Sequence, residues 1–462
     1  MDEVDVVLVT PPVTDEHGDG RRQEPLGLGY LAAVLKNAGY SAKIIDAYGF
    51  DIPMRRTVGL VDYINPKIIG ISSGSPMYRE AERLKTELQK FLPGTPIIKG
   101  GYDPTFYHKK IVEEDPNVIA VREEGEGTLV ELTDSLIKGS RSLDSIQGTT
   151  WHNGEVVVVN PDRPLIQDLD ALPFPNRDDI RPENYHVPGT DLGTGILVSR
   201  GCMVGGCTFC DIRKFYGGVH RTRSPENIVE EMENLRENYP LMGVFDLKAD
   251  SFLTDASVWE VIYELMSKKD LDHRVGFETR ADLIIKNRDL LRETKDRIGY
   301  LNIGFESFSD AQLKRWKKGT TAEQNLEAVA ILRELEIPFI GYFLMVDKEA
   351  VLEEVQQSLS GLMYPIPDLW TDIYWDRAHA VCNGRDTPSM KECSESVLAV
   401  MAFANFFAGI IDEARMVYHP SNQSRLDAVG KEAMQQLQSG VTDLVRGYFS
   451  TALEYGQSIE RR

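Results

Sequence analysis

Cysteine is scarce in this chain of 462 residues, and its scarcity excludes one class of protein. There are five cysteines, and none precedes Cys202. An odd number at this low density does not suit the disulfide framework of a secreted protein. The N-terminal run MDEVDVVLVTPP has no basic segment ahead of its apolar residues, so it predicts a first strand and not a signal peptide. We therefore expect a soluble, cytoplasmic protein.

Positive charge and long apolar runs are also lacking. Lysine and arginine total 51 against 72 aspartates and glutamates, which argues against a nucleic-acid-binding protein. The longest apolar run, Val397–Ile411, is shorter than the roughly 18–20 residues that span a bilayer, so it predicts a buried helix. With 42% hydrophobic residues, the chain has enough apolar material for the two or three domains that its length predicts.

Residues 1–145 alternate short apolar strands with helical stretches. The expected strands are 5–9, 42–46, 67–72, 96–99 and 118–121, with helices at 28–37, at 79–92 and from Gly127 to Leu136. This order is typical of parallel βαβ units, and it predicts a doubly wound, Rossmann-like domain of the α/β class. Polar and Gly-rich segments follow the strands, at the edge where such sheets bind ligands.

A second βα series follows a predicted linker at 146–190, which contains a hairpin near Asn153. Strands are expected at 196–199, 244–248, 274–278, 300–305 and 338–345. A series of this length predicts a partial (β/α)6 barrel of the TIM type over residues 191–385, with its active site at the carboxyl ends of the strands. Residues 386–462 are expected to form a helical C-terminal region.

Three cysteines lie close together in a Gly-rich loop that follows the first strand of this series. The segment reads Ser199-Arg200-Gly201-Cys202-Met203-Val204-Gly205-Gly206-Cys207-Thr208-Phe209-Cys210. Such a loop can wrap three thiolates around one metal centre. A structural zinc site normally takes four ligands, and His220 is a candidate fourth. Three thiolates with an open position instead favour an iron–sulfur cluster that binds a further ligand.

The cysteine segment resembles the cluster loop of the radical S-adenosylmethionine (SAM) enzymes. That family usually has three and then two residues between its cysteines, whereas this chain has four and then two. Gly205 and Gly206 give the backbone freedom to absorb the additional residue. The resemblance implies that Cys202, Cys207 and Cys210 are the catalytic metal ligands of a 4Fe-4S cluster, and that SAM binds the free iron.

Later segments resemble the strand ends of the same family. These are FDLKADSF (245–252), FETRAD (277–282) and NIGFES (302–307) followed by Lys318-Gly319-Thr320. The resemblance implies that Phe209 lies beside the adenine of SAM and that Asp250, Arg280 and Glu306 hold the cofactor. The alternative for each charged residue is a salt bridge or a capped strand end.

The first domain resembles the cobalamin-binding domain that precedes many radical SAM enzymes, in the segments at 25–39, 99–101 and 122–132. The resemblance implies that strand-end loops meet the corrinoid through Thr10, Pro11, Ser72, Ser73, Gly74, Ser75, Gly100, Gly101, Tyr102, Glu124, Gly125, Glu126 and Gly127. The alternative is that these glycines only form tight turns. The Asp-x-His-x-x-Gly motif of cobalamin-dependent mutases is absent, and Tyr102 and Asp103 stand where the family often has a histidine.

Together these resemblances imply a cobalamin-dependent radical SAM methyltransferase. In the implied reaction, a 5′-deoxyadenosyl radical removes hydrogen from an unactivated carbon of a small-molecule or natural-product substrate, and methylcobalamin supplies the methyl group. The implied partner is an electron donor of the flavodoxin or ferredoxin type, with no nucleic acid and no membrane span. Two alternatives remain: a cobalamin-dependent radical SAM rearrangement or cyclisation enzyme, and a non-enzymatic corrinoid or zinc sensor.

Overall fold

A computed structural model of the chain divides it into two compact units, Met1–His186 and Val187–Arg462. The structure describes residues 4–12, 23–74, 77–185, 192–204, 206–344, 349, 351, 353–354, 357–358 and 369–373. Within these residues, no helix has the length and apolar character that crossing a membrane requires.

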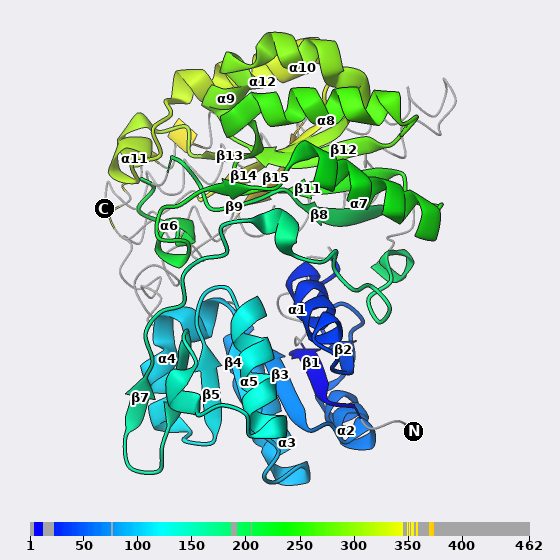
Figure 1. Cartoon of the computed structure of the whole chain (residues 1–462). Helices are drawn as coiled ribbons and strands as arrows, with labels where there is room; N and C mark the ends of the chain where they lie inside the picture. The colour runs from blue at the N-terminus through cyan, green and yellow to red at the C-terminus, as the bar shows by residue number, and fades with distance from the viewer. Residues whose placement is uncertain are drawn as a thin grey trace. The chain divides into compact units, whose positions relative to one another are not determined.

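The first unit is built on a seven-stranded sheet in the order β2-β1-β3-β4-β5-β6-β7 (Figure 1). Its strands are β1 (Val6–Thr10), β2 (Ala42–Asp46), β3 (Ile68–Ser72), β4 (Ile97–Gly100), β5 (Val118–Val121), β6 (Thr149–His152) and β7 (Val157–Val159). Its α-helices are α1 (Leu26–Asn37), α2 (Met54–Ile64), α3 (Tyr78–Phe91), α4 (Tyr102–Glu114) and α5 (Glu126–Lys138). Strands β1 to β5 are parallel, and β6 and β7 are antiparallel.

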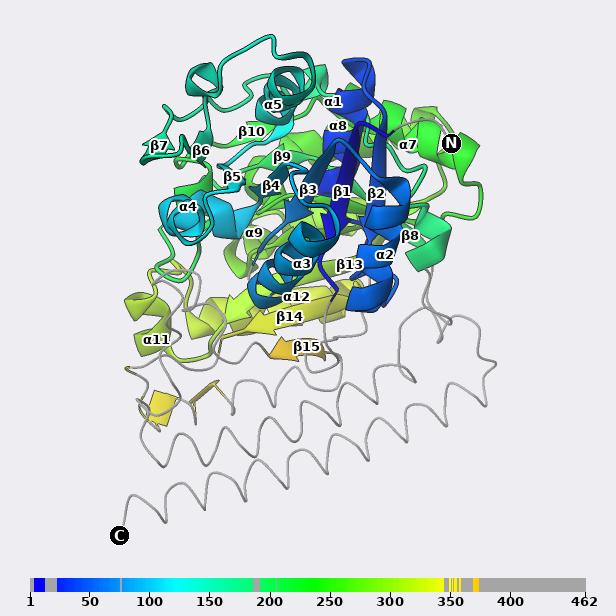
Figure 2. The same cartoon turned by 90° about the horizontal axis from the view of Figure 1, so that it is seen from below.

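Helices cover both faces of this sheet, because its central strands are apolar on both sides. All five residues of β1 are buried, and its four apolar residues alternate between two hydrophobic clusters. Val6 and Leu8 pack with α1 and α5, whereas Val7 and Val9 pack with α2 and α3. Figure 2 shows the two helical layers on either side of the sheet. Burial on both faces is typical of parallel strands in doubly wound folds, and the predicted fold class is confirmed.

The hairpin predicted near Asn153 is present, and it is part of the first sheet. Strand β6 pairs antiparallel with β5, and β7 pairs with β6. The first unit also extends to His186, so most of the segment predicted as a linker lies within it.

The second unit contains a six-stranded, all-parallel sheet in the order β15-β14-β13-β12-β11-β8. Its strands are β8 (Gly193–Leu197), β11 (Val244–Lys248), β12 (Arg274–Thr279), β13 (Ile298–Glu306), β14 (Phe339–Phe343) and β15 (Leu369–Ile373). Its helices are α6 (Ile212–Phe215), α7 (Pro225–Asn238), α8 (Ala256–Lys268), α9 (Ala281–Lys286), α10 (Arg288–Thr294), α11 (Asp310–Arg315) and α12 (Ala322–Leu335). The short strands β9 (Ser199–Arg200) and β10 (Arg221–Thr222) pair antiparallel with each other.

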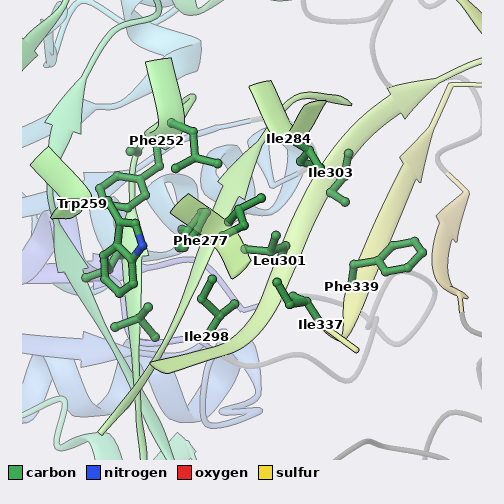
Figure 3. Packing of buried hydrophobic residues seen from close by; sticks show 14 of the residues in the cluster. Phe252, Trp259, Phe277, Ile284, Ile298, Leu301, Ile303, Ile337 and Phe339 are labelled. Carbon is green, nitrogen blue, oxygen red and sulfur yellow. The ribbon is translucent and has the colours of Figure 1, made fainter. Parts of the chain in front are cut away.

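One face of the second sheet packs against helices α7, α8, α9, α10 and α12. Figure 3 shows Phe277, Leu301 and Ile303 from the strands in one cluster with Trp259 of α8 and Ile284 of α9. Sequential parallel strands with helices on a single face are the arrangement of a (β/α) barrel, so the predicted partial barrel is confirmed. The predicted C-terminal helical region, 386–462, lies outside the described residues.

Candidate active site

The cysteine loop begins at the carboxyl end of the first barrel strand, where Gly201 makes a tight turn. Gly201 has a φ of +90°, and a Cβ there would collide with the carbonyl oxygen of Val219, so only glycine fits. Cys202, Cys207 and Cys210 follow on this loop, all three as free thiols of intermediate burial. The Cys210 amide donates to the Cys207 carbonyl oxygen at 3.3 Å, so these two thiols are carried on one turn of backbone.

Asp250, which follows strand β11, holds the start of the cysteine loop. Its carboxylate accepts a hydrogen bond from the Gly201 amide at 2.9 Å. Burial raises the pKa of Asp250 to about 6, because the hydrogen bond from Gly201, which lowers this pKa, offsets only part of the effect of burial. The group therefore changes charge near neutral pH, beside the loop that carries the thiols.

Lys318 joins two of the predicted cofactor-binding residues. Its ammonium group donates to Glu306 Oε1 at 2.9 Å, and its carbonyl oxygen accepts from Arg280 Nη2 at 2.8 Å. Glu306 has a φ of +68°, which directs the end of β13 away from regular strand geometry. A Cβ at Gly304 would lie 2.9 Å from Lys318 Nζ, so glycine there makes room for the ion pair.

The segment around Lys318 also contacts the cysteine loop. The Thr208 amide donates to the Trp316 carbonyl oxygen at 2.8 Å, and the Phe209 and Trp316 rings meet edge to face with centroids 6.1 Å apart. Lys318 Nζ lies 5.9 Å from the centre of the Phe209 ring, within cation–π range. The loop and the ends of β12 and β13 are therefore brought together through residues 316–318.

The charges of this site act on the thiols. Burial raises the pKa of Cys207, and the nearby cations Lys318 and Arg280 oppose that rise. Burial raises the pKa of Cys210 to about 11. Both thiols are therefore protonated at neutral pH in the metal-free protein, and binding a metal centre must displace those protons.

The donor set suits a cluster that is bound by three cysteines. Each thiol is partly accessible, and the thiols of Cys202 and Cys207 interact electrostatically with Cys210. In the described part of the chain, no three histidine, cysteine, aspartate or glutamate side chains are placed to hold a single metal ion. An iron–sulfur cluster does not require such an arrangement, because its ligands bind different irons and need not converge on one atom. His220, the candidate fourth zinc ligand, is a half-buried side chain whose pKa is lowered by burial.

The first unit has its own candidate site, where the strand order reverses between β1 and β3. Doubly wound sheets with the order 2-1-3-4-5 bind ligands at this point, outside the carboxyl ends of the strands. Gly74 and Gly100 lie on two of the strand-end loops, and a Cβ at either would meet nothing within 4 Å. At these two glycines a ligand can therefore approach the backbone closely.

Gly101 and Ser73 hold two of these loops against each other. Gly101 has a φ of +107°, and a Cβ there would lie 2.7 Å from the Ser73 carbonyl oxygen. The Ser73 amide donates to Gly100 at 2.8 Å, and its hydroxyl donates to Asp103 at 3.1 Å. The following residue, Tyr102, is exposed at the start of α4.

Several residues predicted to contact the corrinoid also make contacts within the fold. The Thr10 hydroxyl donates to Asp46 and accepts from the Tyr48 amide. The Glu124 carboxylate accepts from the Ile166 amide at 2.7 Å, and Glu126 is buried. The remaining residues are Pro11, which is buried, and Ser72, Gly125 and Gly127, which are partly exposed; Ser75 lies outside the described residues.

Sequence reasoning did not assign a role to Lys318 or Trp316, although Lys318-Gly319-Thr320 was part of the resemblance. The sequence did place a lysine and a glycine shortly after the fourth barrel strand, which could have marked Lys318 as a candidate. The role of Lys318 follows only from the tertiary contacts that its segment makes with Glu306, Arg280 and the cysteine loop.

Comparisons with known families match both units. Residues 20–133 match the B12 binding domain, and residues 196–360 match the radical SAM superfamily. Together the two matches cover more than half of the chain.

Curated relatives match much of the chain at moderate identity. The chain is 27% identical over 363 residues to an uncharacterised methyltransferase of Pyrococcus horikoshii, covering 78% of each protein. It is 26% identical over 355 residues to the anaerobic magnesium-protoporphyrin IX monomethyl ester cyclase of Synechocystis sp., covering 76% of this chain and 70% of the cyclase. It is 25% identical over 323 residues to the hopanoid C-3 methylase of Methylococcus capsulatus, covering 68% of this chain and 60% of that enzyme.

Solved structures agree with the fold. The cobalamin-dependent SAM radical enzyme OxsB, with aqua-cobalamin and SAM bound, superposes with a TM-score of 0.67 at 22% identity. That match covers 80% of this chain and about half, 53%, of OxsB. The radical SAM methyltransferase TsrM from Kitasatospora setae superposes with a TM-score of 0.64 at 19% identity, covering 80% of this chain and 72% of TsrM.

Proposed function

Because this chain belongs to the radical SAM enzymes that carry an N-terminal B12-binding domain, we propose that it methylates an unactivated carbon of a small molecule. The proposed cofactors are a 4Fe-4S cluster, SAM and cobalamin. We further propose that a small flavodoxin- or ferredoxin-type protein donates electrons, and that the enzyme works in the cytoplasm, where thiols stay reduced.

One observation carries the proposal: the loop with three free thiols is hydrogen-bonded to the segments that carry the charged groups a SAM molecule needs. The loop is tied to Asp250 through Gly201 and to the Lys318 segment through Thr208. Arg280 and Glu306 meet at the same segment. The site thus has two carboxylates for the ammonium or ribose hydroxyls of SAM and a guanidinium for its carboxylate.

We assign the following roles to the residues of the second unit. Cys202, Cys207 and Cys210 bind the cluster, and Phe209 packs beside the adenine. The ionised carboxylate of Asp250 binds SAM. The same carboxylate also accepts the hydrogen bond from the Gly201 amide and so fixes the position of the loop. When bound, the cluster supplies the electron that cleaves SAM, and the corrinoid supplies the methyl group.

The first unit binds the corrinoid through backbone and small side chains. Gly74 and Gly100 allow close approach, and the Gly101–Ser73 contact keeps the two loops at a fixed separation. Tyr102 stands where the cobalamin-binding domains that the first unit resembles often have a histidine, and we propose that the corrinoid is bound without a protein imidazole at that position.

The proposal is tested by incubating anaerobically reconstituted protein with SAM that carries a deuterated methyl group and with a strong reductant. We expect 5′-deoxyadenosine, S-adenosylhomocysteine and a deuterated methyl group on the bound corrinoid. Formation of 5′-deoxyadenosine without any labelled corrinoid would refute methyl transfer.

A second candidate function is radical cyclisation, because several curated relatives are named as anaerobic magnesium-protoporphyrin IX monomethyl ester cyclases. The two functions differ in the mass of the product. A methyltransferase adds the deuterated methyl group to its substrate, whereas a cyclase forms a ring without gaining it.

A further inference from the structure

Several polar residues of the barrel strands face away from the helices, among them Asp246, Lys248, Glu278 and Asn302. Phe245 and Leu247 of β11, Val275 and Phe277 of β12, and Leu301 and Ile303 of β13 belong to the buried cluster with the helices. Side chains alternate along a strand, so Asp246, Lys248, Glu278 and Asn302 point to the opposite side of the sheet. We call this side the inner face, because it corresponds to the interior of the barrel.

These four residues are close to one another. Glu278 and Asn302 are direct neighbours in the register of β12 and β13. On the neighbouring strand β11, Lys248 donates to Asp246 two residues before it, and the charges of Lys248, Asp246 and Asp250 all act on the carboxyl group of Glu278. Lys248 and Glu278 are partly exposed, so the inner face is accessible at this level.

Two oxygens of the group are buried without a hydrogen-bond partner. Asp246 and Asn302 are each only 7% exposed, and among the described residues nothing donates to Asp246 Oδ1 or Asn302 Oδ1. Folded proteins rarely leave a buried acceptor unsatisfied, and the exceptions concentrate at functional sites. Both oxygens require a donor that the described part of the chain does not supply.

The chemistry of the missing donor follows from the composition of the group. Asp246, Glu278 and Asn302 offer acceptors, while Lys248, the cation whose charge acts on Glu278, already donates to Asp246. Asp250 adds a further carboxyl group, so acidic groups outnumber basic ones. An ammonium group matches both the charge and the unsatisfied acceptors, whereas a carboxylate or phosphate is repelled.

We propose that the inner face of the barrel binds a protonated amine of the substrate through Asp246, Glu278 and Asn302. This inference rests on the proposed function and narrows it, because it names the substrate as an amine-bearing small molecule.

The test measures binding of a simple amine to the full chain, reconstituted anaerobically. Calorimetric titration with n-butylamine should show binding, whereas n-butanol and n-butyrate should not bind. Glu278→Gln and Asn302→Leu should each weaken butylamine binding by about tenfold or more, the loss expected for one charge-assisted hydrogen bond.

A stability measurement separates a binding role from a structural one. Asn302→Leu removes an unsatisfied acceptor, so the melting temperature of the ligand-free protein should stay the same or rise. The matched control is Asn325→Leu, because the Asn325 amide donates to the Phe305 and Ser307 carbonyl oxygens at 3.1 and 2.9 Å. This control should lower the melting temperature.

The proposal is overturned if butylamine does not bind, if both variants bind it as well as the parent, or if Asn302→Leu destabilises as much as Asn325→Leu. Iron and corrinoid content, measured on the same samples, report separately on the proposed function. Normal cofactor content with no amine binding would remove only this inference.

Discussion

The ion pair between Lys318 and Glu306 is the most testable feature of the site. Both side chains are buried, with 7% and 10% of their surface exposed, and their charged atoms are 2.9 Å apart. Removing one partner of a buried pair leaves the other charge uncompensated, which costs about 3–5 kcal/mol. We therefore expect Lys318→Met to lower the free energy of unfolding of the second unit by about that amount.

The double variant distinguishes a specific pair from loss of packing. In Lys318→Met/Glu306→Gln neither charge is left alone, so much of the loss should be recovered. Lys314→Met is the control, because Lys314 is an exposed lysine on the preceding helix, and its change should stay within about 0.5 kcal/mol.

The assay is urea unfolding of the cofactor-free protein under reducing conditions, followed by tryptophan fluorescence. Trp151 of the first unit is replaced by phenylalanine in every variant, so that the signal reports on the second unit. The reasoning is refuted if Lys318→Met behaves like Lys314→Met, or if the double variant is as unstable as the single one.

Three further predictions concern the cofactor sites. Burial raises the pKa of Asp250 to about 6, so SAM binding, measured by equilibrium dialysis, should tighten as pH rises from about 5 to about 7 and Asp250 ionises. Asp250→Asn should weaken binding about tenfold and abolish this pH dependence; an unchanged profile would contradict the assigned role. Gly101→Ala should lower both the melting temperature of the first unit and its cobalamin uptake more than Gly139→Ala does. Both glycines have a positive φ, but only Gly101 faces a close backbone contact, which is with Ser73. Equal effects of the two substitutions would count against the importance of that contact. Replacing Cys202, Cys207 and Cys210 together by alanine should abolish bound iron and 5′-deoxyadenosine formation while leaving the cobalamin spectrum intact, and iron retained by this variant would exclude these ligands.

The alternation of strands and helices could be predicted from the sequence because the strands are short, apolar and β-branched. Strands β2, β5 and β11 begin and end at the predicted residues. Helices α2 and α4 were not predicted. Helix α2 carries Gly59 and β-branched residues in its interior, and α4 contains Pro104 and a kink at Tyr107, so residue propensities favour a helix in neither segment.

Motifs in the sequence named candidate residues, but they did not reveal the contacts between them. The three cysteines, Asp250, Arg280 and Glu306 were candidates from the sequence, whereas the hydrogen bond from Gly201 to Asp250 and the ion pair with Lys318 required the structure. Strands buried on both faces are normally apolar throughout, so Asp246 within β11 was a signal of the inner face that the sequence already contained.

The central claim is that one chain holds an iron–sulfur cluster in its second unit and a corrinoid in its first. The most direct measurement is the metal and corrinoid content of the anaerobically reconstituted protein. The account predicts about four irons per chain together with one corrinoid. About one equivalent of zinc without iron, or the absence of any bound corrinoid, would contradict it.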